Sequence, residues 1–309
     1  GPIVLPLFVA AAMLLLDERR RIIKGVLSLS AMAAILIMAL VLLHESATGG
    51  SGGGDTARIY QLGGWAAPYG IVLVADRLST FMVALTSVLG ACSLIFALAR
   101  WDRAGPRFHA LFLLLAMGVN GAFLTGDLFN LFVFFEIMLA ASYGLALHGS
   151  GEARIRAGLT YIAVNLTASL LFLIGVSLIY GVTGTLNMAD LALRLPAIAE
   201  GNRGLFHVGA AVLGTAFLIK CAMWPVGFWL TPTYAAASAP AAAAFAILSK
   251  VGVYVIIRLS LLLFGADAGV SAGFGQGWLL AGGLATMGFG TAGLLASRGV
   301  VVSPLGVSR

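Results

Sequence analysis

The stretch DLFNLFVFFEIMLAASY, from Asp127 to Tyr143, decides the fold class. It is almost wholly apolar around one carboxylate, Glu136, nine residues after Asp127. A bilayer core of about 30 Å takes roughly 20 apolar residues as a helix, so Glu136 falls near the midplane. A charge there costs at least about 2.5 to 3.5 kcal/mol and normally faces protein. We predict a membrane helix with a functional acid; the alternative is a carboxylate that only locks two helices together.

The rest of the 309-residue chain has the same apolar character. Hydrophobic residues make up 61% of it, charged residues 10%, and the mean hydropathy is +1.04. These values exclude an ordinary soluble protein and predict an all-α integral membrane protein, because only helices satisfy their own backbone in lipid. About nine apolar runs are candidate transmembrane helices: 2–16, 22–43, 78–99, 108–125, 128–147, 158–180, 205–230, 240–264 and 278–296.

Basic residues orient this bundle. They gather in three short connections, 17–24, 100–107 and 148–157, rather than in one field, so we expect a lipid bilayer as partner and no nucleic acid. Cytoplasmic loops carry such an excess, which predicts a multi-pass membrane protein with its N-terminus outside. The long connection 44–77 is then external, as a small β-hairpin or an irregular loop, and residues 185–198 form a helix on the outer surface.

A second stretch, FLIKCAMWPVGFWL, carries Lys220 five residues before Pro225. Because Pro225 cannot donate to the carbonyl of Cys221, we predict one broken helix here. Freed backbone at membrane depth is tolerated only inside protein or beside water. Lys220 is therefore expected to line a hydrated, protein-buried site; the alternative is a proline kink that serves structure alone.

The third stretch, PAAAAFAILSKVGVYVIIR, places Lys250 ten residues beyond Pro240 and deep in its run. Desolvation disfavours a charged ammonium, so a buried lysine can alternate between charged and neutral forms. Lys250 is thus a candidate relay for a proton. The alternative is a lysine that reaches an interface past Ser249 or Tyr254.

Two further polar residues fit the same pathway. Tyr143, seven residues after Glu136, shares its helix face, and Asn165 in the run 158–180 is placed to bond water, although it could equally serve packing. Cys92 and Cys221 lie far apart in apolar runs, and no Rossmann, Walker A or iron–sulfur spacing occurs, so we expect no cofactor and no metal.

The motifs TGDLFNLFVFFEIMLAASY, LIKCAMWPVGFWL and LSKVGVYVIIR resemble the antiporter-like membrane subunits that Mrp cation/proton antiporters share with respiratory complex I. With GIVLVADRLS, from Gly70 to Ser79, the closer likeness is to the D-type subunits of Mrp (Pha) antiporters, from Pro2 to about Ser297. The resemblance implies two inverted five-helix repeats after three leading helices. Glu136 would tune Lys220, the central proton carrier, and Lys250 would relay the proton onward.

The same resemblance implies a division of the chain. Residues 1–107 would hold the three N-terminal helices, 108–264 the first repeat as a proton half-channel, and 265–297 the start of the second repeat. Residues 298–309 depart from the family pattern, which predicts a truncated tail.

The expected function is a subunit of a multi-subunit Na⁺/H⁺ antiporter rather than an enzyme. Its partners would be the other Mrp-type subunits, protons and monovalent cations. The alternative is a proton-pumping membrane subunit of NADH-quinone oxidoreductase or of a membrane hydrogenase.

Overall fold

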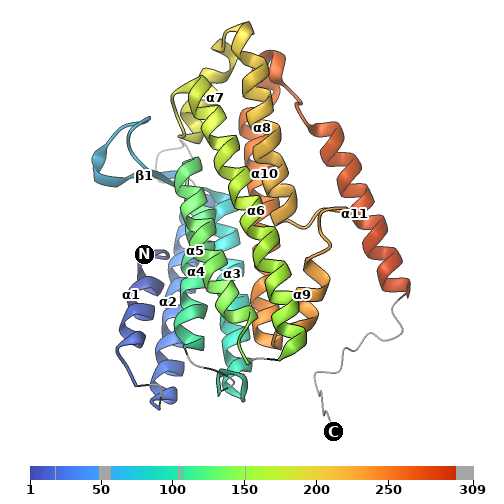
Figure 1. The fold of residues 1–309 in the computed structure, drawn as a ribbon. Helices are drawn as coiled ribbons and strands as arrows, with labels where there is room; N and C mark the ends of the chain where they lie inside the picture. Colours follow the sequence, from blue (N-terminus) through green and yellow to red (C-terminus); the bar gives the residue numbers. More distant parts are fainter. Residues whose placement is uncertain (18, 49–56, 104, 106, 150, 297–309) are drawn as a thin grey trace.

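The structure, a computed structural model, describes residues 1–17, 19–48, 57–103, 105, 107–149 and 151–296. The glycine-rich stretch 49–54 and the expected tail 298–309 lie outside the described residues. Within them the chain forms a bundle of helices with one small sheet at its side (Figure 1).

Seven described helices are long and apolar enough to cross a membrane. They are α2 (Arg21–Thr48), α3 (Arg77–Leu98), α5 (Leu128–Ala146), α6 (Glu152–Thr183), α8 (Glu200–Lys220), α10 (Ala239–Leu263) and α11 (Gln276–Ala296). Two apolar runs form shorter helices, α1 (Val4–Leu14) and α4 (Phe108–Leu124). Of the nine predicted spans, seven are therefore present in the described residues as helices long enough to cross a membrane, and two are present as shorter helices. At about 1.5 Å per residue, the 11 residues of α1 extend about 17 Å.

Within the connection 44–77, the described residues 58–75 form a hairpin rather than an irregular loop. Strands β1 (Arg58–Gln61) and β2 (Val72–Ala75) pair antiparallel, with Arg58 opposite Ala75. The predicted surface helix within 185–198 is present as α7 (Met188–Arg194), and α9 (Leu230–Ala236) is a second short helix. Four 3-10 turns complete the described elements: η1 (Leu62–Gly64), η2 (Trp101–Arg103), η3 (Leu195–Ala197) and η4 (Ala266–Ser271).

The connections separate to two ends of the bundle. The hairpin, the α4–α5 turn and α7 lie at the upper end in Figure 1, where single bridges join Leu73 to Thr125 and Asp127 to Asn187. Away from the hairpin, His148 after α5 contacts the carbonyl of Trp101 after α3 at 3.2 Å, which joins the connections 148–157 and 100–107. Arg21 and Lys24 line one cavity with Arg103 and Arg107, so the described residues of the three basic connections share one end, as the predicted orientation requires. Which end faces the cytoplasm stays a prediction.

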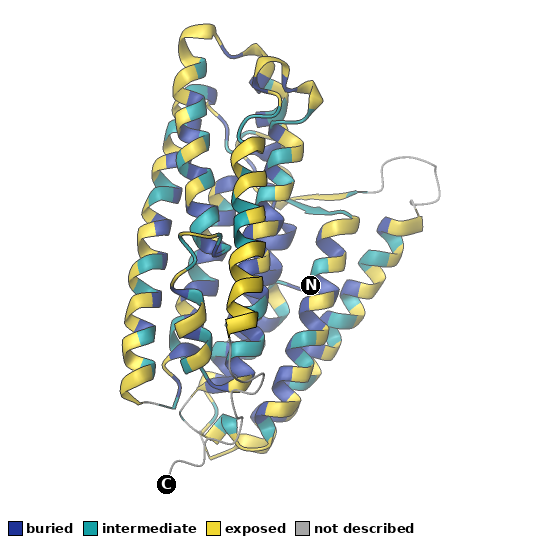
Figure 2. Cartoon of the chain, turned by 90° about the vertical axis from the view of Figure 1, so that its right-hand side faces the viewer, coloured by how far each residue is buried: buried dark blue, intermediate teal, exposed yellow. Residues whose placement is uncertain are grey.

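Glycines let the central helices approach closely, as is typical of membrane helices. A Cβ at Gly118 of α4 would lie 2.7 Å from the backbone nitrogen of Met138 in α5. The same distance separates a Cβ at Gly175 of α6 from the nitrogen of Leu213 in α8. In contrast, α11 has no buried residue and is largely exposed in Figure 2. It contacts the rest of the chain where the Trp224 N–H donates to the Thr286 hydroxyl at 3.0 Å.

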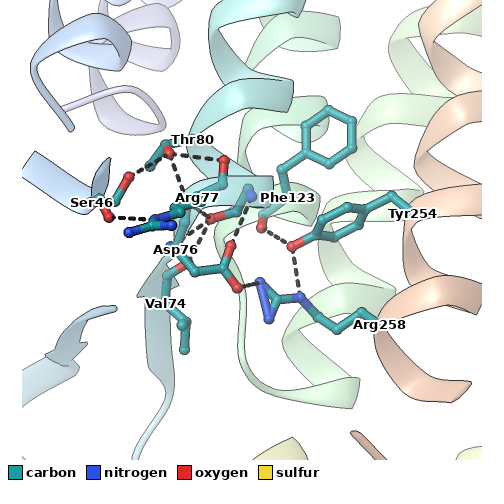
Figure 3. Close-up of polar contacts among 9 residues, drawn as sticks. Ser46, Val74, Asp76, Arg77, Thr80, Phe123, Tyr254 and Arg258 are labelled. Carbon is teal, nitrogen blue, oxygen red and sulfur yellow. Dashed lines mark hydrogen bonds and ion pairs between the residues drawn. The ribbon is translucent and has the colours of Figure 1, made fainter. Parts of the chain in front are cut away.

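A polar network ties the N-terminal helices to the later ones (Figure 3). Asp76, which caps the start of α3, pairs with Arg258 of α10 at 2.6 Å. Arg258 also donates to the Tyr254 hydroxyl at 2.7 Å, and that hydroxyl donates to the carbonyl of Phe123 at 2.6 Å. Phe123 lies in the last turn of α4, where helix carbonyls need partners from elsewhere. Three helices are thus joined at the hairpin end.

Candidate functional site

The predicted helix break is present. α8 ends at Lys220, residues 221–229 form turns, and the chain becomes helical again at Leu230. The helix ends five residues before Pro225 rather than at it. Ala222 adopts the left-handed conformation with φ of 57°, which stops the helix earlier. Pro225 therefore lies inside the break and keeps it from resuming.

The break is supported by specific contacts. The indole nitrogen of Trp229 donates to the carbonyl of Ile219 at 3.1 Å, so one carbonyl freed by the helix end is satisfied. A Cβ at Gly227 would lie 2.2 Å from the carbonyl oxygen of Ala222, so only glycine fits there. A Cβ at Gly252 would lie 2.9 Å from the nitrogen of Cys221, so α10 passes directly against the break.

Glu136 and Lys220 meet through one hydroxyl. The Ser169 hydroxyl of α6 donates to Glu136 Oε1 at 2.5 Å, and Lys220 Nζ donates to the same Ser169 oxygen at 3.1 Å. Lys220 is buried with 4% of its surface exposed, whereas Glu136 is half-buried on α5. Lys220 also ends α8, where the partial negative charge of the helix terminus favours a cation. Three helices therefore place an acid, a hydroxyl and an amine in series.

A cluster of buried aromatic side chains lies beside the amine. Lys220 Nζ lies 5.0 Å from the ring centre of Phe135, a favourable cation–π distance. Phe172 packs on both Phe135 and Phe217, with ring centres 6.1 and 5.1 Å away, and all three rings are buried. In such apolar surroundings an ammonium depends on its few polar contacts. Ser169 and, through it, Glu136 supply them.

Lys250 does not join this group in the described structure. Its Nζ donates to the neighbouring Ser249 hydroxyl at 3.3 Å, and its side chain is exposed, contrary to the burial expected from the sequence. The reason is its place on α10. Val253, Ile257 and Leu261 follow it at helical spacing and are 44%, 43% and 73% exposed. Lys250 lies on this outward stripe.

Neither auxiliary residue, Asn165 or Tyr143, is hydrogen-bonded to the acid–amine series in the described structure. Asn165 is 1% exposed, and its amide donates to the Tyr161 carbonyl of its own helix at 2.9 Å. The Tyr143 hydroxyl is buried without a hydrogen-bond partner among the described residues, and its ring packs edge-on against Tyr161. Asp127 caps α5 by accepting from the backbone of Asn130, in agreement with its assignment as a helix-start residue.

Sequence reasoning missed Ser169, the residue that connects the other two. It lies four residues after Asn165, so the two share one face of α6. That spacing of polar residues in an otherwise apolar run was the available signal. The arrangement can hold a proton on either side of the hydroxyl, because a serine both donates and accepts.

The family follows from residues in this part of the chain. The model of the family described as NADH:quinone oxidoreductase/Mrp antiporter, transmembrane, matches residues 125–298, which hold the acid, the break and both lysines. The chain belongs to this family. The resemblance noted in the motifs is thereby confirmed, and the chain is a multi-pass membrane protein of the antiporter family.

Relatives in this family include named antiporter subunits. The D-type subunit of a probable K(+)/H(+) antiporter of Rhizobium meliloti is 58% identical over 96% of this chain and 55% of its own length. The D-type subunit of the Na(+)/H(+) antiporter of Alkalihalophilus pseudofirmus is 40% identical over 87% of this chain and 53% of its own length. The structure of the Mrp complex from Dietzia sp. DQ12-45-1b superposes with a TM-score of 0.75 at 35% identity, over 85% of this chain and 48% of that one. The chain spans about half the length of the curated relatives it matches.

Proposed function

We propose that the chain is the D-type subunit of a multi-subunit monovalent cation/proton antiporter, and that its protons pass along Glu136, Ser169 and Lys220. The hydrogen-bonded series of these three side chains carries the proposal. It lies beside a broken helix, where backbone at membrane depth needs protein or water around it. The relatives that share the motifs are named as D-type subunits of K⁺/H⁺ or Na⁺/H⁺ antiporters.

In this proposal a proton on Lys220 moves through the Ser169 hydroxyl to Glu136, and the reverse transfer restores the ammonium. Each step exchanges one hydrogen bond for another, so no bare charge is left in the aromatic surroundings of the amine. Lys250, which faces outward on α10, would carry the proton onward, a role that rests on the resemblance of its motif to the family's motif. Residues 108–264 would form the first repeat, with its basic connections in the cytoplasm.

The proposal is tested in the complete complex, expressed in salt-sensitive cells that lack their own antiporters. Glu136→Gln and Lys220→Ala should each abolish growth at raised Na⁺ or K⁺ while leaving the subunit in the membrane. Glu200→Gln, at the exposed start of α8, is the matched control and should retain growth. Normal salt resistance in either site variant would contradict the assigned roles.

The second candidate, a subunit of a redox-driven proton pump, rests on the family description, which also covers NADH:quinone oxidoreductase. Everted vesicles separate the two. An antiporter dissipates an imposed pH gradient when Na⁺ or K⁺ is added without any electron donor. A gradient that changes only with a reduced donor would favour the redox pump. Adding Na⁺ and K⁺ in turn identifies the cation.

A further inference from the structure

A cavity of about 280 Å³ lies at the end of the bundle where α1 ends and α2 and α4 begin, the lower end in Figure 1. It is separate from the Lys220 site and has no part in the proposed proton path. Since a water molecule occupies about 30 Å³, the cavity has room for a tetrahedral anion with several waters.

The charge around this cavity favours an anion. Among the described residues that line it, four carry cationic side chains, Arg21, Lys24, Arg103 and Arg107, and one, Asp102, carries a carboxylate. Lys24 is only 5% exposed. Two helices also begin here and present the positive ends of their dipoles. At the start of α4, Arg107 is left-handed with φ of 62° and makes no side-chain cap hydrogen bond.

The apolar surface beside the cavity indicates where the anion comes from. Leu14 lines the cavity and is 55% exposed, and its neighbours Leu15 and Ile22 are 90% and 83% exposed. In a membrane protein, exposed leucine and isoleucine near the ends of helices contact the acyl chains just below the headgroups. A basic cavity that opens onto such a surface fits a lipid, whose phosphate enters while its chains remain on the apolar side.

Asp102 adds a selectivity element. Its side chain is 6% exposed, and its Oδ2 lies 3.7 Å from His109 Nε2. Its Oδ1 is buried and has no hydrogen-bond partner among the described residues. A buried carboxylate oxygen calls for an N–H or O–H donor. We propose that this cavity binds the phosphate of a membrane phospholipid whose headgroup carries an ammonium or hydroxyl donor for Asp102.

Native mass spectrometry of the purified chain in detergent tests this, with phosphatidylethanolamine, phosphatidylglycerol, phosphatidylcholine or inorganic phosphate added separately. The first two should bind more tightly than phosphatidylcholine, whose headgroup offers no donor. Arg103→Gln and Arg107→Gln remove exposed side chains and should each weaken binding by about fivefold. Arg156→Gln removes a cation from the same end but outside the cavity and should change nothing.

Asp102→Asn tests the donor separately. It should keep lipid binding and lose the preference over phosphatidylcholine. Unchanged lipid binding in the Arg103 and Arg107 variants, or an equal loss in Arg156→Gln, would overturn the site. Inorganic phosphate that displaces the lipid at equal concentration would overturn the lipid assignment, and phosphatidylcholine that binds as tightly as phosphatidylethanolamine would overturn the role of Asp102.

Discussion

Replacing Ser169 with alanine removes the one hydroxyl between Glu136 and Lys220. Both of its hydrogen bonds, at 2.5 and 3.1 Å, are made to groups that carry charge, and each such bond contributes about 1.5 to 3 kcal/mol. If both are needed as the proton moves, their loss at the low end raises the barrier by about 3 kcal/mol. The rate of proton transfer should then fall roughly 100-fold.

The assay is proton flux in proteoliposomes that contain the complete complex, driven by an imposed cation gradient and followed with an internal pH dye. Ser169→Thr keeps a hydroxyl and should retain much of the rate. Thr167→Ala, two residues away on the exposed face, removes a hydroxyl that bonds only its own helix and should leave the rate unchanged. A wild-type rate for Ser169→Ala would refute the relay, as would an equal loss in Thr167→Ala.

Three further predictions concern the frame around the site, and each is checked by thermal unfolding in detergent. Arg258→Gln breaks the partly buried pair with Asp76 and should lower the free energy of unfolding by about 2 kcal/mol; an unchanged midpoint would show that the pair contributes nothing. Gly252→Val should destabilise the protein by about 1 to 3 kcal/mol, because a Cβ there contacts the backbone of Cys221 in the break. In the control Gly214→Val the Cβ has no atom within 4 Å, so the loss of stability should be smaller, and equal losses would contradict the close contact. Burial lowers the pKa of His148 from its ordinary 6.5, so the folded protein favours the neutral imidazole more than the unfolded chain does. The stability that the neutral imidazole contributes is present above pH 6.5 and is lost as the pH falls from 6.5 through the lowered pKa. Wild-type protein should therefore lose more stability between pH 7.5 and 5 than His148→Gln, and parallel curves would exclude this role.

Much of this architecture is encoded in local sequence. Apolar runs bounded by charges predict the helices, and Pro225 predicts that α8 is interrupted nearby, because both follow from backbone hydrogen bonding in lipid. The residue at which α8 ends is set by the left-handed Ala222, which the sequence does not reveal. The hairpin follows from its β-branched residues and punctuating glycines. Local sequence does not give the residue at which every helix begins and ends: the run 2–16 contains the shorter helix α1, whereas the run 108–125 matches α4 to within one residue.

The candidate site depends on which helix faces meet, and single residues do not reveal that. Serine and threonine within helices commonly bond their own backbone, as Thr167 does, so the spacing of Ser169 from Asn165 does not reveal that its hydroxyl bonds a side chain on another helix. Lys250 looked buried because its neighbours in sequence are apolar, but many of those neighbours face outward. The pair of Asp76 and Arg258 joins residues 182 positions apart and needs the assembled bundle.

The two fixed points of α10 have a mechanical consequence. Gly252 seats the helix on the backbone of Cys221, and Arg258 holds it to Asp76 six residues higher, about 9 Å along the axis. A slide of one residue would rotate the helix by about 100° and disengage both points together. We therefore expect α10 to keep its position relative to α3 and to the break. Movement during transport would then be confined to side chains and to the non-helical segment 221–229.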